Sequence, residues 1–376
     1  MIEADVMVGS GMKVTCGREE LSQRLGVVAR AVSTRSAVQV LLGVLLRAEG
    51  GKLELAATDM ELSLRASLSA EVGDEGAVVV PGRLLVDIVR LLPAGEVVIE
   101  HRAEENVVRV ECGSASYRLN TYSVEDFPRL PDVETVQTFA VEREALLDTI
   151  AKVSRSASRD ESRPVLTGIL VRFEGSKLVM AATDSYRLAV KETDLEASPP
   201  ELEAIVPARA LGELTRIAQS GDTIDLGVQE NQIVFSTDEI WLTTRRIDGQ
   251  FVNVKQLFPE SFEHEVRVSR TELLEVVRRM AVMAQRNAPL RLRFAEGELT
   301  VSARSQDVGE SQESLPAAYP GEPLEIGFNA EFLREGIESI GAEEITLSLI
   351  SPLRPVVIEG AADDPRYLIM PIRLAG

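Results

Sequence analysis

The chain has few of the residues that build catalytic, redox and metal sites. Its 376 residues include two cysteines, two histidines and one tryptophan, and aromatic residues amount to 4%. Cys16 and Cys112 are too few for a disulfide framework or a metal-ligand cluster, and such sparse cysteine is typical of a reducing compartment. We therefore predict a cytoplasmic protein that holds no cofactor and no metal.

Long apolar runs and targeting signals are also missing. The longest apolar stretch, around 38–46, is interrupted by Gln39 and is far shorter than the roughly 20 residues of a membrane-spanning helix. No basic segment followed by an apolar one opens the chain as in a signal peptide, so we expect no membrane partner. Residues 1–11 precede Met12 and are either a natural extension or the remnant of a tag.

Common catalytic motifs are absent from the sequence as well. It contains no Walker loop, no G-x-G-x-x-G segment after a strand, no G-x-S-x-G elbow and no H-E-x-x-H pair. His101 and His264 have no partner cysteine and no metal-ligand spacing. These absences favour a binding or scaffolding protein over an enzyme.

Positive charge is in the minority. Lysine and arginine number 40 against 60 aspartate and glutamate, which leaves a formal net charge of −20 at pH 7. Because a basic footprint is the usual sign of a nucleic-acid ligand, the total charge argues against one. A phosphate backbone responds to the local field, however, and not to the sum, so the positions of the cations decide the question.

What the sequence does contain is one pattern of about 125 residues written three times. Each copy starts with three apolar residues spaced like one face of a helix. They are Leu21, Leu25 and Val28, then Leu146, Ile150 and Val153, and then Leu273, Val277 and Met280. The segment AATD marks the first two copies, at 56–59 and 181–184. A second helix is expected after Pro81, Pro207 and Asn329, since proline is favoured early in a helix.

Alternating and apolar runs with glycine turns fill the rest of each copy and predict antiparallel hairpins. Each copy is as long as a whole domain and far longer than solenoid repeats of roughly 20–50 residues. The sequence therefore predicts an α+β protein of three homologous domains, each with two helices packed on antiparallel sheet. The expected domains are residues 12–135, 136–262 and 263–376, after the extension at 1–11.

Arginines recur at matching places on the second helix of two copies. Arg83 and Arg90 are seven residues apart, and so are Arg209 and Arg216. Seven residues make about two turns, so each pair shares one helix face. A solvated face is the plain interpretation, and the functional one is a basic surface that binds phosphate backbones without reading bases.

With three α+β repeats, no catalytic set and basic helices, the chain resembles the bacterial β sliding clamps, the processivity subunits of replicative DNA polymerases. The likeness runs from about Met12 to the C-terminus. Its most specific segments are RPVLTGI (163–169), AATDSYRLA (181–189), DGQF (248–251) and YLIMPIRL (367–374).

The resemblance implies a head-to-tail homodimer that forms a closed ring of six similar domains, with helices around the hole and sheets outside. A basic hole inside an acidic exterior would reconcile the net charge of −20 with sequence-independent binding of double-stranded DNA. The implied function is a DNA sliding clamp, not an enzyme. It tethers the replicative DNA polymerase, the clamp loader and repair proteins, and confers processivity by topological linkage.

The resemblance further implies a hydrophobic pocket for short linear peptides of those proteins. Leucine and methionine walls would take an apolar anchor, and Arg187, Arg373 and Asn329 would hold polar groups of the peptide. The matching positions are Leu166, Thr183, Tyr186, Arg187, Leu188, Leu257, Asn329, Leu368, Met370, Ile372 and Arg373. Ser185 stands where the family often has glycine and Val252 where proline is common, so the rim is expected to differ.

Two more residue sets complete the expected ring. The DNA-facing set is Arg35, Arg83, Arg90, Arg155, Arg209 and Arg216. For the dimer interface the resemblance points to Tyr117 and Leu119 in the first domain against Ala281 and Val282 in the third. An apolar strand edge would meet a helix with a small side chain, in a heterologous contact that closes.

Two other functional classes stay open from the residues alone. Asp59 and Asp184 could serve an acid–base hydrolase, although the third copy has SARSQD (302–307) at that place and an aspartate after a strand is more often a turn former. A scaffold that captures polymerase peptides without DNA in its hole is the second alternative. The paired arginines argue against it.

Overall fold

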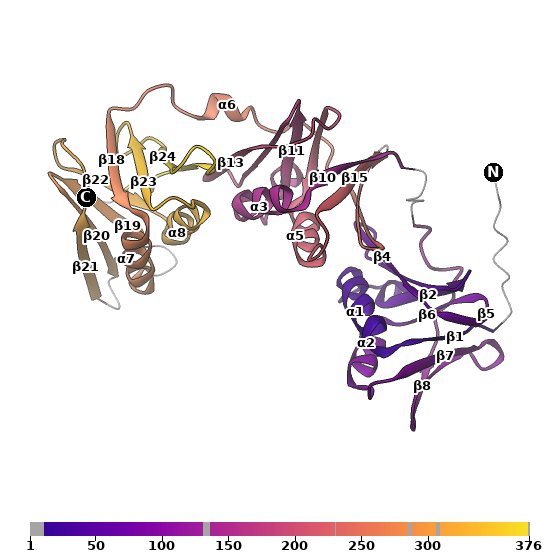
Figure 1. The fold of residues 1–376 in the computed structure, drawn as a ribbon. Helices are drawn as coiled ribbons and strands as arrows, with labels where there is room; N and C mark the ends of the chain where they lie inside the picture. Colours follow the sequence, from indigo (N-terminus) through magenta and orange to yellow (C-terminus); the bar gives the residue numbers. More distant parts are fainter. Residues whose placement is uncertain (1–10, 131–135, 230, 285–287, 306–308, 375–376) are drawn as a thin grey trace. The chain divides into compact units, whose positions relative to one another are not determined.

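The computed structural model describes residues 11–130, 136–229, 231–284, 288–305 and 309–374, which Figure 1 draws in sequence colours. Except for Gly11, the expected extension at 1–11 lies outside the described residues. The chain packs as two compact units, Met1–Ala140 with Arg216–Arg246 and Val141–Thr215 with Ile247–Gly376. Neither unit coincides with one copy of the repeat, because the middle copy contributes strands to both.

The first unit is built on two antiparallel sheets. The first sheet has the order β5 (Glu71–Asp74), β1 (Lys13–Gly17), β7 (Glu96–Arg102), β8 (Val107–Cys112) and β9 (Ala115–Asn120). The second has the order β10 (Thr138–Glu142), β15 (Thr223–Gln229), β16 (Gln232–Thr237), β17 (Ile240–Arg245), β4 (Leu62–Ser69), β3 (Lys52–Thr58), β2 (Gly43–Glu49) and β6 (Gly76–Pro81).

Two α-helices cover these sheets. The helix α1 (Arg18–Val28) packs on β3 and β4, and α2 (Gly82–Leu91) packs on α1, β2 and β6. The predicted apolar face of α1, Leu21, Leu25 and Val28, is fully buried. Short 3₁₀ turns lie at η1 (Ala29–Ala31), η2 (Gln39–Leu42) and η3 (Ala103–Glu105).

The second unit also has two antiparallel sheets. The third sheet of the chain has the order β14 (Leu202–Pro207), β11 (Gly168–Glu174), β12 (Lys177–Thr183), β13 (Arg187–Asp194), β25 (Arg366–Ile369), β24 (Val356–Glu359), β23 (Glu344–Leu349) and β18 (His264–Ser269). The fourth has the order β21 (Gly309–Pro316), β20 (Glu298–Ser305), β19 (Leu290–Ala295) and β22 (Leu324–Phe328).

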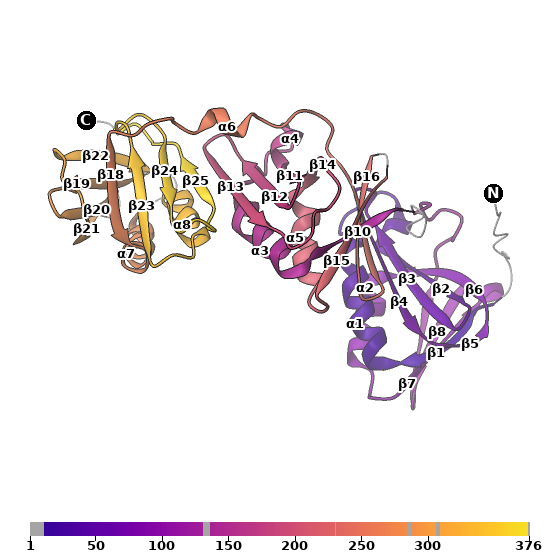
Figure 2. The same cartoon turned by 45° about the horizontal axis from the view of Figure 1, so that its top comes forward.

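Three long helices of this unit lie against those sheets. The helix α3 (Arg143–Val153) packs on β12 and β13, α8 (Ala330–Ser339) on β25, and α7 (Arg270–Met283) on α8, β20 and β21. Figure 2 shows α3 and α8 beside the third sheet, with α6 on its other side. Shorter elements are η4 (Ser154–Ser156), α4 (Pro164–Thr167) and α6 (Val254–Leu257), and α5 (Ala208–Ile217) crosses the boundary between the units.

The repeated apolar ladders are confirmed. Leu146, Ile150 and Val153 are buried on α3, and Leu273, Val277 and Met280 are buried on α7. Their spacing places each set on the one helix face that meets a sheet.

The helix starts are confirmed in position and corrected in detail. The three second helices do begin right after Pro81, Pro207 and Asn329. Pro81 is the last residue of β6 and the N-cap of α2, however, so it precedes the first helical residue. Asn329 caps α8 through its side chain, and Ser269 caps α7 by accepting from Glu272 N at 3.4 Å. An N-cap of this kind stabilises a helix by about 1 kcal/mol.

Successive copies of the repeat are joined by shared sheets, which the sequence did not predict. The strand β17 of the middle copy pairs with β4 of the first, and β25 of the third copy pairs with β13 of the middle one. Both junctions have the same register, with Leu64 opposite Leu242 and Ala189 opposite Tyr367. Each junction is therefore a continuous sheet, and the helices α1 and α3 lie on one face of it.

Candidate functional site

The turn between β12 and β13 gives the predicted segment 183–187 a defined shape. Thr183 Oγ1 donates to Arg187 O at 2.6 Å and accepts from Ser185 N at 3.1 Å. Asp184 Oδ1 accepts from the N–H groups of Tyr186 and Arg187, at 2.9 and 3.0 Å. Ser185 has a φ of +80°, in the left-handed region that glycine enters most easily. This conformation accounts for the glycine that the family often has there.

The first copy of the repeat forms the same turn. Asp59 Oδ1 accepts from Glu61 N at 3.1 Å and from Leu62 N at 2.9 Å. Met60 has a φ of +80°, as Ser185 does. Both aspartates therefore shape a turn with their carboxylates, which favours that role over acid–base catalysis.

Arg187 lies inside the unit and not on its rim. Its side chain is 8% exposed, and its Nε donates to Asp184 Oδ2 at 3.0 Å. The Nη1 atom is paired with Glu335, the Nη2 atom donates to Arg155 O, and the guanidinium carbon lies 4.2 Å from the centre of the Phe332 ring. The predicted role of binding polar groups of a peptide is thus replaced by a positioning role that links the turn to α8 and to the end of α3.

Tyr367 completes this buried polar group. Burial raises the pKa of its phenol, although the adjacent Arg187 guanidinium acts in the opposite direction. The phenol therefore stays protonated at neutral pH and donates to Phe332 O at 2.8 Å. A Cβ at Gly336 would overlap the tyrosine ring, so this helix residue has to be small.

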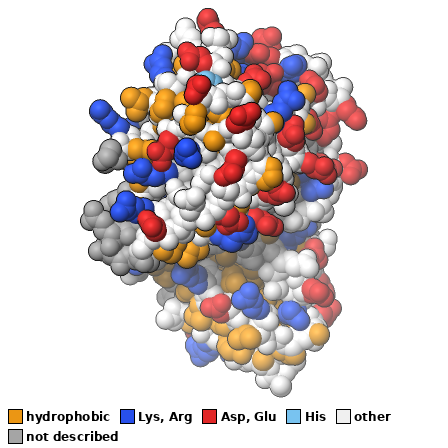
Figure 3. Space-filling view, turned by 90° about the vertical axis from the view of Figure 1, so that its left-hand side faces the viewer, with side chains coloured by type: hydrophobic (Ala, Val, Ile, Leu, Met, Phe, Trp, Pro, Cys, Tyr) orange, Lys and Arg blue, Asp and Glu red, His pale blue; other side chains and the backbone are white. Residues whose placement is uncertain are grey.

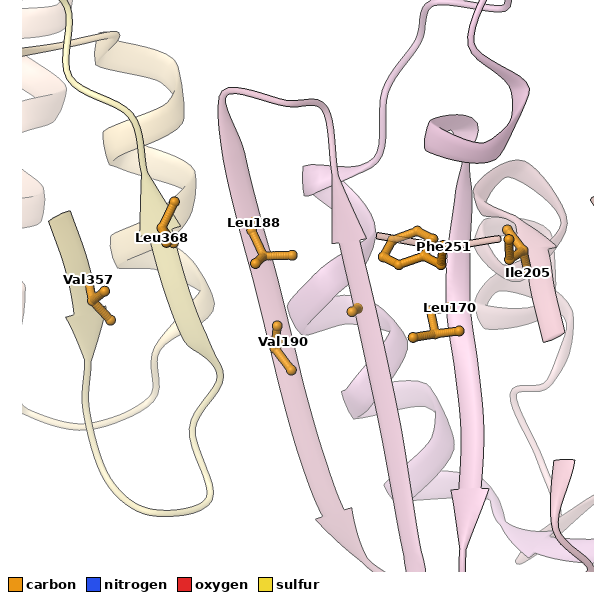
Figure 4. Close-up of a cluster of buried hydrophobic side chains, with 8 residues drawn as sticks. Leu170, Leu188, Val190, Ile205, Phe251, Val357 and Leu368 are labelled. Carbon is orange, nitrogen blue, oxygen red and sulfur yellow. The ribbon is translucent and has the colours of Figure 1, made fainter. Parts of the chain in front are cut away.

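An apolar cluster lies on the opposite face of the third sheet. Leu188 and Leu368 are cross-strand partners on β13 and β25, and Figure 4 shows them with the other members of the cluster. The buried members are Leu170, Ala181, Leu188, Val190, Ile205, Phe251, Val357 and Leu368, and Val165, Val179, Ile247, Val254, Phe258 and Phe262 pack against them. The predicted pocket residues Leu188 and Leu368 are therefore part of the core, and they form the floor of the candidate site.

Several large apolar side chains remain exposed beside this floor. Tyr186 is 61% exposed, Leu257 45% and Met370 39%. Val252 and Ile372 are exposed to a similar degree. Met370 N donates to Tyr186 O at 2.8 Å, which holds these two residues next to each other. Val252, a departure from the family's pattern, directly follows Phe251 of the apolar cluster.

The chain end passes from this site to the fourth sheet. Ile372 N donates to Gly327 O at 2.7 Å, and an added Cβ at Gly327 would lie 2.6 Å from Leu374 Cδ2. The close approach fixes the segment that carries Met370. Asn329 is two residues further along, and its Oδ1 accepts from Glu331 N and Phe332 N as the cap of α8.

The remaining predicted pocket residues are Leu166 and Arg373. Leu166 is half-buried in α4, and its carbonyl accepts from Ser158 N at 2.8 Å. Arg373 is exposed. Sequence reasoning missed Phe251 and Phe258 as part of the site. The sequence signal for these two residues was the presence of aromatic side chains in the connection between the second and third copies. There DGQF (248–251) and the following residues pack against the sheet.

All six arginines of the predicted DNA-facing set are exposed. Arg155, however, donates to Glu338 Oε2 at 2.5 Å, and Arg278 donates to Glu338 Oε1 at 2.8 Å. The carboxylate is partly buried, which raises its pKa, but the two arginines outweigh this and lower it. Arg155 thus contributes less free positive charge than the sequence predicted.

The predicted dimer residues lie on one strand of the first unit and one helix of the second. Tyr117 and Leu119 are on β9, the last strand of the first sheet, where Tyr117 is exposed and Leu119 is buried. Ala281 and Val282 are near the end of α7, and Val282 is 82% exposed.

Charge does not separate by sign on the face that Figure 3 shows, where acidic and basic side chains lie among apolar ones.

Burial, together with Glu20, raises the pKa of the Cys16 thiol to about 12, so it carries no thiolate at neutral pH. In the described part of the chain no group of three His, Cys, Asp or Glu residues is placed to hold a metal ion. No described helix is long and apolar enough to cross a membrane.

Comparison with known families matches the chain in three consecutive parts. The matches are the N-terminal domain of the DNA polymerase III beta subunit over residues 12–131, its central domain over 140–253 and its C-terminal domain over 255–373. The chain is 36% identical to a beta sliding clamp of Streptomyces coelicolor, over 97% of this chain and 100% of the relative. It is 37% identical to one of Synechococcus elongatus, over 96% and 100%.

Solved structures show the same likeness. The DNA polymerase sliding clamp from Bacillus subtilis matches with a TM-score of 0.92 and 25% identity, over 97% of this chain and 100% of that one. The sliding clamp from Pseudomonas aeruginosa bound to griselimycin matches with a TM-score of 0.89 and 30% identity, over 97% and 100%.

Proposed function

The chain belongs to the DNA polymerase III beta subunit family, the bacterial β sliding clamps, and on that premise we propose that two copies close head to tail around double-stranded DNA. As a clamp it is a processivity factor of DNA replication in the cytoplasm and not an enzyme. It tethers the replicative DNA polymerase, the clamp loader and repair proteins, which bind the apolar site around Tyr186 through short linear peptides.

The observation that carries this proposal is the repeated sheet junction. In both internal junctions the last strand of one copy pairs with the fourth strand of the copy before it, as β17 with β4 and β25 with β13. The same rule leaves β9 at an edge of the first sheet and β21 at an edge of the fourth. Because edge strands present unpaired N–H and C=O groups, we propose that β9 pairs with β21 of a second copy.

The helices support the same contact. Inside the second unit, a hollow between α3 and α8 is lined by Arg155, Ser339 and Tyr367, among others. Their counterparts in the repeat are Val282 on α7, Leu91 on α2 and Tyr117 on β9. Val282 and Leu91 are 82% and 81% exposed. Their burial against each other in a dimer would remove two of the most exposed apolar side chains from water.

The shared register also predicts which side chains meet. Leu188 faces Leu368 in one junction, and Ser63 faces Thr243 in the other. The corresponding pair at the proposed interface is Arg118 with Glu310 of the partner subunit. Both residues are exposed within their own chain. A cation and an anion would thus lie directly opposite each other across the two strands.

A charge exchange tests this register. Arg118→Glu alone is expected to raise the dimer Kd about 30-fold, because like charges directly opposite on paired strands cost about 1 kcal/mol at each of the two interfaces of the ring. Adding Glu310→Arg restores an opposite-charge pair and should return the Kd close to the original value. Analytical ultracentrifugation over a dilution series measures both. Arg354→Glu, at an exposed position away from both edges, is the matched control, and a double variant as weak as the single one would refute the register.

For DNA we propose that the exposed arginines of the predicted set contact the phosphate backbone. They lie on α2, on α5 and in the segments after α1 and α3. Weak contacts that ignore the base sequence suit a ring that has to slide. The ion pair of Arg155 with Glu338 further weakens the attraction between this arginine and DNA phosphates. The closed ring, and not a high affinity for DNA, therefore keeps the protein on the duplex.

The experiment for the proposed function joins solution mass with retention on DNA. We expect a species of twice the 41.0 kDa chain mass. Loaded by a cognate clamp loader and ATP, it should stay on nicked circular DNA and leave when the circle is linearised. Equal retention on circular and linear DNA, or no retention with a loader shown to be active on another clamp, would overturn the proposal.

A further inference from the structure

A second hollow lies in the first unit, at the place that corresponds to the apolar site by the repeat. It lies where the turn before β4, the strand β17 and the segment 128–130 meet. The lining residues are Thr58, Met60, Glu61, Ser63, Pro128, Arg129, Leu130, Gln232, Thr243, Thr244 and Arg245.

The two places share a backbone and differ in side chains. The turn 58–62 repeats the hydrogen bonds of the turn 183–187. Where the apolar site has Leu188, Leu368, Tyr186 and Met370, this hollow has Ser63, Thr243, Glu61 and Arg245. The repeat therefore keeps the backbone of the site and replaces these apolar side chains by hydroxyl and charged groups. An apolar peptide anchor does not suit such walls.

Two arginines give the hollow positive charge. Arg129 and Arg245 are both exposed, and neither forms an ion pair with any acidic residue in the described part of the chain. Glu61 contributes one carboxylate, so the charged lining is positive by one. Two guanidinium groups on one hollow are suited to binding a carboxylate through paired N–H donors.

A buried acceptor points to a second requirement of the ligand. Gln232 Oε1 is buried and has no hydrogen-bond partner among the described residues, although buried polar atoms in proteins are nearly always paired. Gln232 lies opposite Arg245 across β16 and β17. The same hollow thus combines cationic donors with an acceptor that an N–H group would satisfy.

From this combination we infer that the hollow binds an extended acidic segment of a partner protein. The carboxylate of an aspartate or glutamate accepts from Arg129 and Arg245, and the Gln232 side chain turns toward the hollow so that its Oε1 accepts from a backbone N–H of the segment. The hollow is then a second docking site, on the face of the second sheet away from α1. It differs in chemistry from the site around Tyr186, and it does not depend on that site being occupied.

Fluorescence anisotropy on the full-length protein tests the inference. The probe is a fluorescein-labelled peptide of alternating glutamate and alanine, and the comparison peptide has glutamine in place of glutamate. Arg129→Glu with Arg245→Glu is expected to weaken probe binding at least ten-fold. The milder Arg245→Gln should give an intermediate loss, which keeps the test valid if the double variant folds poorly. The glutamine peptide should bind the original protein at least ten-fold more weakly than the probe.

Two controls separate this site from general charge and from the proposed function. Arg293→Glu with Arg354→Glu makes the same change in net charge at exposed positions outside the hollow and should leave probe binding within two-fold. Tyr186→Ala with Met370→Ala should also leave it unchanged. An equal loss in the Arg293 and Arg354 variant, or no loss in the Arg129 and Arg245 variant, overturns the inference. A loss in the Tyr186 and Met370 variant would place the probe at the apolar site instead.

Discussion

Replacing Tyr186 and Met370 together by alanine is expected to weaken binding of a short linear peptide from the replicative DNA polymerase at least 30-fold. The two side chains are 61% and 39% exposed in the free protein and flank each other through the bond from Met370 N to Tyr186 O. Burying this apolar surface under a ligand contributes roughly 2 kcal/mol at about 25 cal/mol per Å², and about 1.4 kcal/mol corresponds to a ten-fold change in Kd. Isothermal titration calorimetry measures the change.

The stability of the protein should be nearly unaffected, because both side chains are exposed. Leu84→Ala, at a leucine of α2 that is 48% exposed, is the control and should leave the Kd unchanged. Leu188 is unsuitable for this test. It is 1% exposed in the core, and truncating a buried leucine costs about 2–5 kcal/mol of folding free energy. Undiminished binding by a folded Tyr186 and Met370 variant would show that the ligand site lies elsewhere.

Val282→Arg is expected to raise the dimer Kd at least 100-fold. In the alignment of the three copies, Val282 stands at the position of Arg155, and Arg90 stands at the position of Glu338. At the internal junction Arg155 and Glu338 form an ion pair. In the proposed dimer an arginine at 282 would therefore face Arg90 of the partner subunit. An unpaired charge forced into a buried contact costs about 3–5 kcal/mol, well above the roughly 2.8 kcal/mol that a 100-fold change represents.

Sedimentation equilibrium measures the Kd, and the loaded nicked circle reports the consequence. A monomer cannot stay on a circle by topology, so retention should fall to the level seen after linearisation. Leu353→Arg places the same charge on an exposed leucine away from α7 and should leave both results unchanged. A Val282→Arg protein that remains a dimer at micromolar concentration would exclude α7 from the interface.

Local pattern was enough to predict the elements of each copy. The spacing of Leu21, Leu25 and Val28 specifies a helix with one buried face, and that face is buried. Asp184 after a strand indicated a turn, and its carboxylate does bond the two following N–H groups. Such features depend on residues within a few positions of one another, where backbone geometry leaves few alternatives.

Roles that depend on distant residues could not be read in the same way. Arg187 belongs to the segment that predicted the pocket, but Glu335 is 148 positions away and binds its guanidinium. Arg155 stands in a basic helical stretch, yet Glu338 of α8 neutralises part of its charge. A sequence shows that an arginine is present and not which carboxylate the fold brings beside it.

The sequence by itself determined the threefold repeat, the helices with their buried faces and the repeated turns. Each of these follows from short-range spacing and side-chain type. Only the tertiary structure decided that copies of the repeat share sheets and that β9 and β21 are left as edge strands. It also decided that the first junction carries a polar hollow where the second carries an apolar site. Strand pairing between copies joins residues more than a hundred positions apart, and no local pattern specifies which edges meet.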